Sequence, residues 1–512
     1  MLSNKRLVAS CAIAFCCNVA LLVLFVKYKS AERCYVTINE HQKITTILPD
    51  NFLSIGIDAS EIQDDKVDFT NRRMRDLAAA LSPARLRLGG TLSDRLIFSK
   101  DDTQISCEKP CPKETHSKHC SYLKKVCKHK VLPFFVMTGT KWSSINEFCN
   151  ATNLSLLFTL NVLLRDEHGW NEHNAKELLE YSKHKQFDAD WQLGNEPNSF
   201  HHVFNETISP KTLAHDFEKL RKLLNHSGYK RSLLVGPDTT RPQSTRPECL
   251  TYMEDFLGNA SHFISARSWH QYYLNSRTAT LDDFWNPDTL DLLKGQIESM
   301  RNHTAKYKQI PMWLTETSSS YGGGAPGLSN SFAGSPLWID KLGLTSKHNI
   351  TTVVRQSFIG KYYSLISEDL EPLPDWWISI LYKKLVGNKV LNVKCKCTRF
   401  QRMYAHCANR HYTNDTSAVT VYAINLEMKM VRFSLNGTAL HGEDLDIDEF
   451  IISAPSNNRK SKTVLLNGWP LYYEFPLPDL QPRHHRYGTY ISMPPYSIAF
   501  WVIKNTSIKV CK

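Results

Sequence analysis

The sequence predicts an α/β protein built as a (β/α)₈ barrel followed by an antiparallel β-sandwich. Between about residues 51 and 387, short apolar strands alternate with amphipathic helices. Parallel strands need such crossover helices. Beyond residue 387 the pattern changes to alternating, β-branched runs separated by turn residues, which is typical of a sandwich. The 512 residues and the apolar fraction of 42% are enough for two domains with substantial cores.

The barrel prediction rests on eight strand-like segments that alternate with helical ones. The predicted strands are 52–58, 84–90, 154–161, 190–196, 233–238, 264–273, 312–317 and 351–358. The predicted helices are 74–81, 174–187, 211–225, 248–258, 288–305 and 330–345. Eight such units predict a closed barrel. A doubly wound open sheet is the alternative, but no G-x-G-x-x-G follows the first strand to support a nucleotide-binding version.

The same patterns divide the chain into four parts. Residues 1–30 form an apolar leader, and 31–50 carry strands at 34–38 and 43–48 that we expect to join the sandwich. Residues 51–387 form the barrel, with an irregular Cys- and Lys-rich insertion at about 101–142 and a last helix at 374–387. Residues 388–512 form the sandwich.

The leader contains the uncharged run LVASCAIAFCCNVALLVLFV (7–26), flanked by Lys5, Arg6, Lys27 and Lys29. A helix of about 20 residues spans a bilayer, whereas the apolar core of a signal peptide is about 7–15 residues long. We predict an uncleaved type II signal-anchor, with a long signal peptide as the alternative. Either one delivers the chain to the secretory pathway, as a membrane-anchored, secreted, extracellular or lysosomal protein.

Glycosylation sequons agree with secretion. The asparagines that begin N-x-S/T are Asn150, Asn153, Asn205, Asn225, Asn259, Asn302, Asn349, Asn414, Asn436 and Asn505.

Of the fourteen cysteines, three lie in the leader, which leaves eleven for the lumen. An oxidising compartment favours disulfides, and an odd number leaves at least one thiol outside them or paired between chains. The cysteines and histidines between 107 and 127 fit no standard zinc-finger spacing. We therefore predict no metal and no cofactor.

The net charge of +12 favours polyanionic partners. For a secreted protein, these are sulfated glycans or cell-surface lipids rather than nucleic acid.

Polar residues at the carboxyl ends of barrel strands are the catalytic candidates. They are Asp58, Thr91, Asn161, Asn195, Glu196, Asp238, His270, Tyr272 and Glu316. The only glutamates among them follow the fourth and seventh strands, and two facing carboxylates are what glycosidic bond cleavage requires. We expect Asn195 to bind a sugar hydroxyl and Tyr272 to donate a hydrogen bond to Glu316.

Four motifs carry a resemblance to a known family. They are WQLGNEPNSF (191–200), SWHQYYLNSRTAT (268–280), MWLTETSSSYGGGAP (312–326) and EPLPDWWISILYKKLVGNKVL (371–391). They resemble the heparanase family of retaining (β/α)₈ glycosidases, the endo-β-glucuronidases of heparan sulfate. The resemblance extends from about residue 35 to the C-terminus.

The resemblance implies a double-displacement mechanism with Glu196 as proton donor and Glu316 as nucleophile. It implies a disulfide between Cys407 and Cys511. It also implies a sugar site lined by Asp58, Thr91, Asn195, His270, Tyr272, Arg277, Tyr321, Gly322, Gly323, Gly360 and Tyr363.

The chain departs from the family at several positions. Thr315 stands where the family has glycine, and Gln271 where it has a second histidine, and we expect both side chains to lie beside the two glutamates. The stretch 101–142 is shorter and richer in cysteine than the linker that the family excises, so we expect disulfides to hold it instead. These departures leave two alternatives: a weakly active or inactive heparan-sulfate-binding protein on the same fold, and an exo-β-glucuronidase.

Overall fold

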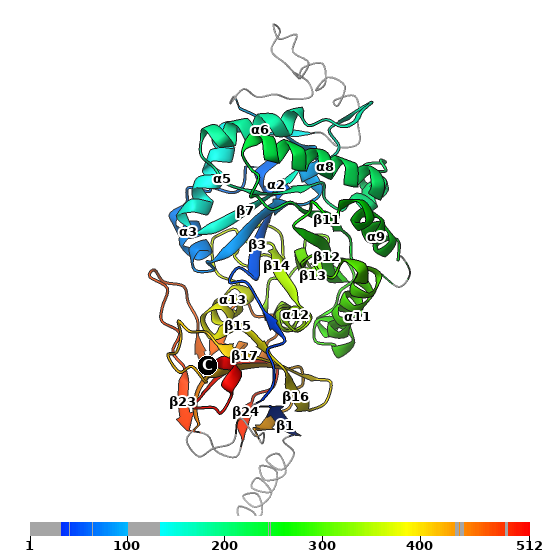
Figure 1. The fold of residues 1–512 in the computed structure, drawn as a ribbon. Helices are drawn as coiled ribbons and strands as arrows, with labels where there is room; N and C mark the ends of the chain where they lie inside the picture. The colour runs from blue at the N-terminus through cyan, green and yellow to red at the C-terminus, as the bar shows by residue number, and fades with distance from the viewer. Residues whose placement is uncertain are drawn as a thin grey trace, which may run out of the picture.

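The computed structural model describes residues 32–512 except 40, 64, 101–133, 244, 246, 436–439, 441–444 and 487–489. The predicted leader, most of the predicted insertion and the sequon asparagine Asn436 lie outside the described residues. Among the described residues, no helix is both long and apolar enough to cross a bilayer. Figure 1 shows a barrel ringed by helices above a β-rich domain, with α12 and α13 between them.

Eight parallel strands form the barrel, in the order β10-β7-β4-β3-β14-β13-β12-β11. A parallel bridge between Trp191 and Leu234 joins the two ends of this order and closes the ring. The predicted closed barrel is therefore confirmed, and the open sheet is wrong. The strands are β3 (Leu53–Asp58), β4 (Ala84–Gly89), β7 (Leu154–Leu160), β10 (Asp190–Leu193), β11 (Val235–Thr239), β12 (Ala266–Asn275), β13 (Met312–Tyr321) and β14 (Ile350–Gln356).

Helices cover the outside of the barrel, and the sequence defines their ends. In α8, Ser209 caps the first turn by accepting a hydrogen bond from Thr212 N, Pro210 is the first helical residue, and Gly228 ends the helix with φ 96°. The longer helices are α3 (Arg72–Ala79), α5 (Gly139–Ala151), α6 (His173–His184), α8 (Pro210–Ser227), α9 (Glu248–Ala260), α11 (Pro287–His303), α12 (Ser335–Lys347) and α13 (Pro374–Leu385).

Regular structure resumes inside the stretch predicted as an irregular insertion. Strand β6 (Phe135–Thr138) pairs in parallel with β5 (Leu96–Ser99), and α5 starts directly after it. The helix forms because Trp142, Ile145 and Phe148 recur at helical spacing and are fully buried. The predicted boundary at residue 142 was therefore too late.

The β-rich domain consists of two sheets. A nine-stranded sheet contains β2 (Thr46–Ile47), β15 (Val386–Leu391), β17 (Gln401–Ala408), β18 (Val419–Asn425), β25 (Ser497–Lys504), β20 (Asp446–Ser453), β21 (Leu465–Leu466), β22 (Trp469–Pro470) and β23 (Arg483–Arg486). A four-stranded sheet contains β16 (Val393–Lys396), β1 (Glu32–Ile38), β19 (Val431–Ser434) and β24 (Ile491–Met493). The sandwich is not wholly antiparallel as predicted, because β1 runs parallel to β19. No hairpin joins these two strands, which come from opposite ends of the chain, so their relative direction is not restricted.

The nine-stranded sheet is buried on both faces. In β18, Val421 and Ala423 belong to the core between the two sheets, whereas Tyr422 and Ile424 belong to the core shared with the barrel. Successive strand residues point to opposite faces, so one strand serves both cores. Helix α13 ends at Leu385, two residues before the predicted end, because the next residues belong to β15.

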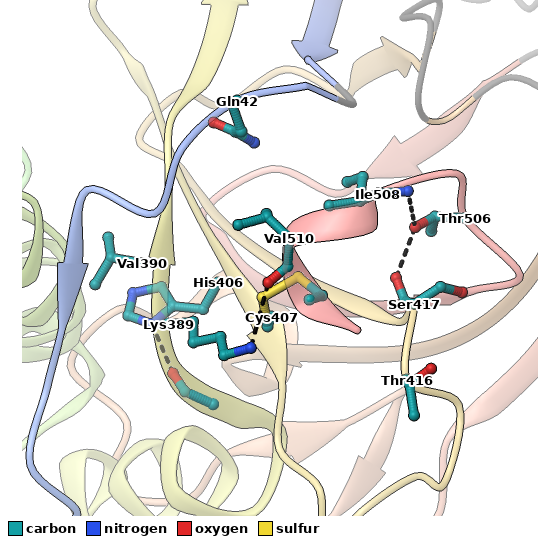
Figure 2. Close-up of a disulfide and its surroundings, with 12 residues drawn as sticks. Gln42, Lys389, Val390, His406, Cys407, Thr416, Ser417, Thr506, Ile508 and Val510 are labelled. Carbon is teal, nitrogen blue, oxygen red and sulfur yellow. Dashed lines mark hydrogen bonds between the residues drawn. A yellow bond between two sulfur atoms is a disulfide. The ribbon is translucent and has the colours of Figure 1, made fainter.

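A disulfide fixes the C-terminus against this sheet (Figure 2). Cys407 on β17 pairs with Cys511, as the family resemblance implies. Lys389 Nζ donates a hydrogen bond to the Val510 carbonyl at 3.3 Å, and Thr506 Oγ1 donates one to the Ser417 carbonyl at 2.6 Å. The last residues of the chain are therefore part of the folded domain.

Candidate active site

Glu196 lies just beyond the fourth barrel strand in a left-handed backbone conformation. Its φ is 56°, and its N–H donates a hydrogen bond to the Asp238 carbonyl at 3.0 Å. Pro197 then begins a 3-10 turn that carries the chain away from the strand. The Glu196 side chain is 30% exposed, so its carboxylate is accessible at the carboxyl end of the barrel.

Glu316 belongs to β13 and faces the same space. Trp269 pairs with Leu314 and His270 pairs with Glu316, so Thr315 is the extra residue of a β-bulge. The bulge lets two consecutive side chains point inward. Thr315 Oγ1 donates a hydrogen bond to Asp238 Oδ1 at 2.6 Å, and Glu316 accepts one from an arginine inside the barrel.

His270 joins the two glutamates. Its Nδ1 atom lies 3.0 Å from Glu196 Oε1 and 3.9 Å from Glu316 Oε2. Because both oxygens contact one nitrogen, they are at most about 7 Å apart. The imidazole is 1% exposed, so the contact is screened from bulk water.

Each oxygen of Glu316 accepts a hydrogen bond. Tyr272 Oη donates to Oε1 at 2.7 Å, which is the hydrogen bond expected from the sequence. Arg87 Nη1 donates to Oε2 at 2.9 Å. Two donors from different strands therefore fix the plane of this carboxylate, whose side chain is 11% exposed.

Arg87 is the central residue that the sequence analysis missed. It also donates to Asp238 Oδ2 and Asn195 Oδ1, each at 2.9 Å, and to Gln192 Oε1 at 2.8 Å. A fully buried charge is rare unless it is paired. The signal in the sequence was a pair of arginines, Arg85 and Arg87, at alternate positions of a barrel strand whose other residues are apolar or glycine.

Asp238 balances the positive charge of Arg87. It also accepts hydrogen bonds from Gln192 Nε2 at 2.6 Å and from Ser268 Oγ. Burial alone would raise the pKa of Asp238, but the cations Arg87 and His270 outweigh burial and hold it well below its usual value. These two cations therefore favour the ionised form of Asp238.

His270 is held in its charged form by the surrounding carboxylates. Burial lowers the pKa of its imidazole, but Glu316, Asp238 and Glu196 outweigh this and raise it to about 10. Its Nε2 atom lies 3.3 Å from Asp238 Oδ2. The protonated His270 donates a hydrogen bond from Nδ1 to Glu196 and forms an ion pair through Nε2 with Asp238.

Asn195 is fixed from both its backbone and its side chain. Its N–H donates to Asp94 Oδ2 at 2.8 Å, and its Oδ1 accepts from Gly90 N at 3.0 Å. Asp94 also accepts from Val162 N at 3.1 Å, and burial raises the pKa of its carboxyl to about 7. With Oδ1 occupied, the side-chain NH₂ of Asn195 is the group left to donate to a ligand.

Several residues of the predicted sugar site surround these carboxylates. Asp58 accepts a hydrogen bond from Gln356 Nε2 at 3.0 Å, and nearby Glu316 contributes, after burial, to the raised pKa of Asp58. The ring of Tyr363 lies 6.2 Å from that of Tyr272. Gly360 precedes Tyr363 on the β14–α13 connection and is buried.

The remaining predicted residues lie farther out. Thr91 begins the turn after β4 and is exposed, and Arg277 is exposed after β12, with no ion pair to another described residue. Tyr321 ends β13, and the following Gly322 and Gly323 have φ values of 80° and 88°. These residues therefore follow the carboxyl ends of β4, β12 and β13, and in the part of the chain that the structure describes no hydrogen bond or ion pair joins them to Glu196 or Glu316.

Gln271 was expected to lie beside the two glutamates, and this prediction is wrong. It is fully buried, and its Nε2 atom donates to Gln296 Oε1 on α11 at 3.1 Å. Strand alternation turns Gln271 outward because its neighbours His270 and Tyr272 point inward. Of the two departures near the glutamates, only Thr315 reaches the site.

The model of the glycosyl hydrolase family 79 N-terminal domain matches residues 59–343. The chain belongs to glycosyl hydrolase family 79. Within this family it is 36% identical to heparanase from Bos taurus, over 90% of this chain and 89% of the relative. The chain is thus a heparanase-like glycoside hydrolase.

This chain is also similar to two proteins that are not named simply heparanase. Inactive heparanase-2 from Homo sapiens is 30% identical over 90% of this chain and 87% of that protein. Hyaluronoglucuronidase from Hirudo nipponia is 26% identical over 93% of this chain and 99% of that protein. A 4-O-α-L-rhamnosyl-β-D-glucuronidase from Fusarium oxysporum matches the fold with a TM-score of 0.62 at 13% identity, covering 91% of this chain and all of that one.

Proposed function

We propose that this protein is a retaining endo-β-D-glucuronidase that cleaves internal bonds of heparan sulfate. The observation that carries the proposal is the contact of His270 with both Glu196 and Glu316. The resulting limit of about 7 Å includes the roughly 5–5.5 Å of retaining enzymes and excludes most of the 6.5–9.5 Å range of inverting ones.

The surroundings of the two glutamates support different roles. Glu316 accepts hydrogen bonds on both oxygens from Arg87 and Tyr272, an arrangement that suits an ionised, oriented nucleophile. Glu196 is more exposed and accepts from His270. In the first step, Glu316 attacks the anomeric carbon while Glu196 gives its proton to the leaving oxygen.

The second step reverses these roles. A glycosyl ester on Glu316 is hydrolysed by water, and Glu196 takes the proton from that water. Asn195, whose amide NH₂ remains available, suits a sugar hydroxyl. Asn195 is fixed by Asp94, Gly90 and Arg87, so sugar binding loses little entropy in ordering its side chain.

The substrate class follows from the relatives and from the outer residues. The relatives named heparanase and hyaluronoglucuronidase act, by their names, on glycans that contain uronate. Arg277 and the positive-φ backbone at Gly322 and Gly323 offer donors to a carboxylate or sulfate. Thirty-six per cent identity with heparanase favours heparan sulfate over hyaluronan.

The test is depolymerisation. The purified protein is incubated with heparan sulfate and, separately, with hyaluronan at about pH 5, where the proton donor must be protonated. Chain length is followed by size-exclusion chromatography. We expect mid-chain cleavage of heparan sulfate, lost in Glu196→Gln and Glu316→Gln and retained in Glu298→Gln, a change to an exposed helix residue with 52% exposure.

Each other outcome selects an alternative. Unchanged chain length with retained heparan-sulfate binding would make the protein an inactive binder. Release of monosaccharide without shortening of the chain would make it an exo-β-glucuronidase. Cleavage of hyaluronan alone would move the substrate to that polymer.

We also propose that the chain is glycosylated in the secretory pathway. Nine of the ten predicted sequon asparagines lie among the described residues, and all nine are exposed on the surface. Treatment with an N-glycosidase is expected to reduce the apparent mass of the protein expressed in animal cells. Sequencing its N-terminus will decide between a retained anchor and a cleaved leader.

A further inference from the structure

The connection between β14 and α13 carries a lysine inside the predicted sugar site. Lys361 lies between Gly360 and Tyr363, which the family resemblance assigns to that site, and it is a residue that the sequence analysis missed. Its backbone has φ 63°, directly after φ 85° at Gly360. A lysine rarely adopts this left-handed conformation, which persists only where the surroundings hold it. The contacts of the connection therefore determine where this side chain lies.

Hydrogen bonds hold this backbone on two sides. The Tyr362 N–H donates to the Gly323 carbonyl at 2.8 Å, which joins the connection to the glycine turn after β13. On the other side, Ser357 Oγ donates to the Gly360 carbonyl at 2.7 Å. The stem of Lys361 lies against the turn, because a Cβ at Gly323 would be 3.9 Å from the lysine Cβ and Cδ. Lys361 thus borders a glycine that was expected to offer a donor to a uronate or sulfate.

The ammonium of Lys361 pairs with a buried carboxylate. Its Nζ atom lies 3.2 Å from Glu61 Oε1, and the Glu61 side chain is 6% exposed. Glu61 belongs to α2 (Ala59–Gln63), the short helix that directly follows Asp58 at the carboxyl end of β3. Glu61 also packs on the connection, since a Cβ at Gly360 would be 2.4 Å from Glu61 Cδ. The carboxylate that holds the ammonium is therefore itself fixed.

Asp58 lies within electrostatic reach of both Lys361 and Glu316. Burial and the charge of Glu316 raise the pKa of Asp58, and the charge of Lys361 acts against them. One carboxyl group thus interacts with the glutamate of β13 and with the lysine after β14. This relationship places the ammonium near the groups that are expected to react.

The two buried cations of the site have no capacity left for an anionic ligand. Arg87 already donates hydrogen bonds to four acceptors, and His270 contacts three carboxylates. Lys361 differs from them. Among the described residues, Glu61 is the only acceptor that its Nζ atom contacts, and its side chain is 39% exposed. An ammonium has three donors, so two of them remain available to a ligand.

We propose that Lys361 is a specificity-determining residue, whose ammonium binds an anionic group of the glycan while Glu61 holds the ammonium in place. The anionic group is a uronate carboxylate or a sulfate, since a compact ammonium binds either one as a point charge. This role rests on the proposed glucuronidase function, because it concerns the charge of the substrate in that same site. Lys361 therefore favours anionic over neutral sugars.

Binding measurements that need no turnover test the contact. Isothermal titration calorimetry is performed at about pH 5 in the Glu196→Gln background, because the amide imitates a protonated carboxyl group and prevents cleavage. The ligands are size-defined heparan sulfate oligosaccharides. We expect Lys361→Met to weaken their binding about 10-fold or more, since hydrogen bonds between charged groups are the strong ones. Lys361→Arg, which keeps the charge, should bind within a few-fold of the parent.

Two further variants separate a ligand contact from a structural role. Lys222→Met is the matched control and should bind like the parent, because Lys222 is also an exposed lysine that pairs with one glutamate, Glu218, at 2.7 Å. Lys361→Met combined with Glu61→Gln removes both members of the ion pair. Binding should stay weak in this double variant. Recovered binding would mean that Lys361 acts only by neutralising Glu61, which would overturn the proposal.

Modified glycans identify the anion. One arm uses carboxyl-reduced oligosaccharides, and the other uses completely desulfated and N-acetylated ones. If Lys361→Met no longer weakens binding of the carboxyl-reduced glycan, the partner of the ammonium is the uronate. If it no longer weakens binding of the desulfated glycan, the partner is a sulfate. Equal weakening for all three glycans, or none for the native one, would contradict the proposed contact.

Failure of this contact is distinguishable from failure of the proposed function. Binding that depends on Lys361, without cleavage by the wild-type protein, would overturn the glucuronidase activity and leave the specificity residue in place. Cleavage by the wild-type protein, with binding indifferent to Lys361, would overturn only the role of this lysine. Absence of binding to the native oligosaccharides would overturn both.

Discussion

Arg87 Nη1 lies 2.9 Å from Glu316 Oε2, and the arginine side chain is 1% exposed. Removing two charges from water costs several kcal/mol per ion, and their attraction often no more than repays it. The pair is therefore poorly explained as a source of stability. It is better explained as a device that holds a carboxylate in one orientation, because Arg87 is itself fixed by three other acceptors.

Arg87→Lys should reduce kcat at least about 100-fold, because one ammonium cannot reproduce the four hydrogen bonds of the guanidinium. Steady-state kinetics on heparan sulfate will measure this. Arg85→Lys is the matched control, since Arg85 lies two residues earlier and pairs with Asp190 at 2.6 Å outside the site. Equal losses in both variants would assign Arg87 a purely structural role.

Tyr272→Phe should lower kcat about 10- to 100-fold with little change in melting temperature, because it removes one donor to Glu316 Oε1 and no buried volume. The adjacent Tyr273→Phe is the control. Tyr273 is equally buried, and its hydroxyl has no hydrogen-bond partner in the described part of the chain. If both variants keep full activity, the hydroxyl of Tyr272 does not orient the nucleophile.

Thr315→Val should cost about 1 kcal/mol of stability and leave kcat within a few-fold, because Asp238 loses one of several donors. Thr315→Gly, which restores the residue that the family resemblance predicts, should likewise leave kcat within a few-fold. Urea denaturation and kinetics will test both. A tenfold gain in kcat for Thr315→Gly would instead show that the threonine restrains catalysis.

The free energy of unfolding should fall as pH rises from about 4 to 7. The unfolded chain loses the Asp94 proton near pH 4, whereas the folded protein keeps it to about 7, so the folded state binds more protons in this range. His270 acts in the same direction between about 6.5 and 10, since its folded pKa is raised to about 10.

Melting curves across pH will test the first of these windows. Asp94→Asn should flatten the decrease between about pH 4 and 7, whereas the exposed Asp369→Asn should not. An unchanged slope in Asp94→Asn would show that another group controls the decrease.

The strands and helices of the barrel were predictable because the strands are short, almost wholly buried runs and the helices between them bury one apolar face. The placement of Glu196 and Glu316 followed from the rule that catalytic groups occupy the carboxyl ends of barrel strands. Arg87 was not predicted, because it lies within a strand, whereas the rule for barrels points to polar residues at strand ends. Its importance comes from four acceptors on or just after three other strands, which no single segment reveals.

Two errors have local physical causes. Gln271 was expected beside the glutamates because it is adjacent to His270 in sequence, but neighbours in a strand face opposite sides. The parallel pairing of β1 with β19 could not be read from either segment, because alternation defines the faces of a strand and not its direction.

The nine-stranded sheet has a consequence for how this enzyme can be divided. One face of β17, β18 and β25 packs against α12 and α13 of the barrel, and Gly343 on α12 lies so close to the Tyr404 ring on β17 that a Cβ would be 2.3 Å from it. Truncation after Leu385 would remove Tyr473 and Tyr422, the rings that pack on Trp376 and Tyr382, and removal of residues 32–50 would take strands out of both sheets. We therefore expect that the barrel does not fold without the β-rich domain. The chain from β1 to Cys511 should be expressed whole and should unfold as one cooperative unit.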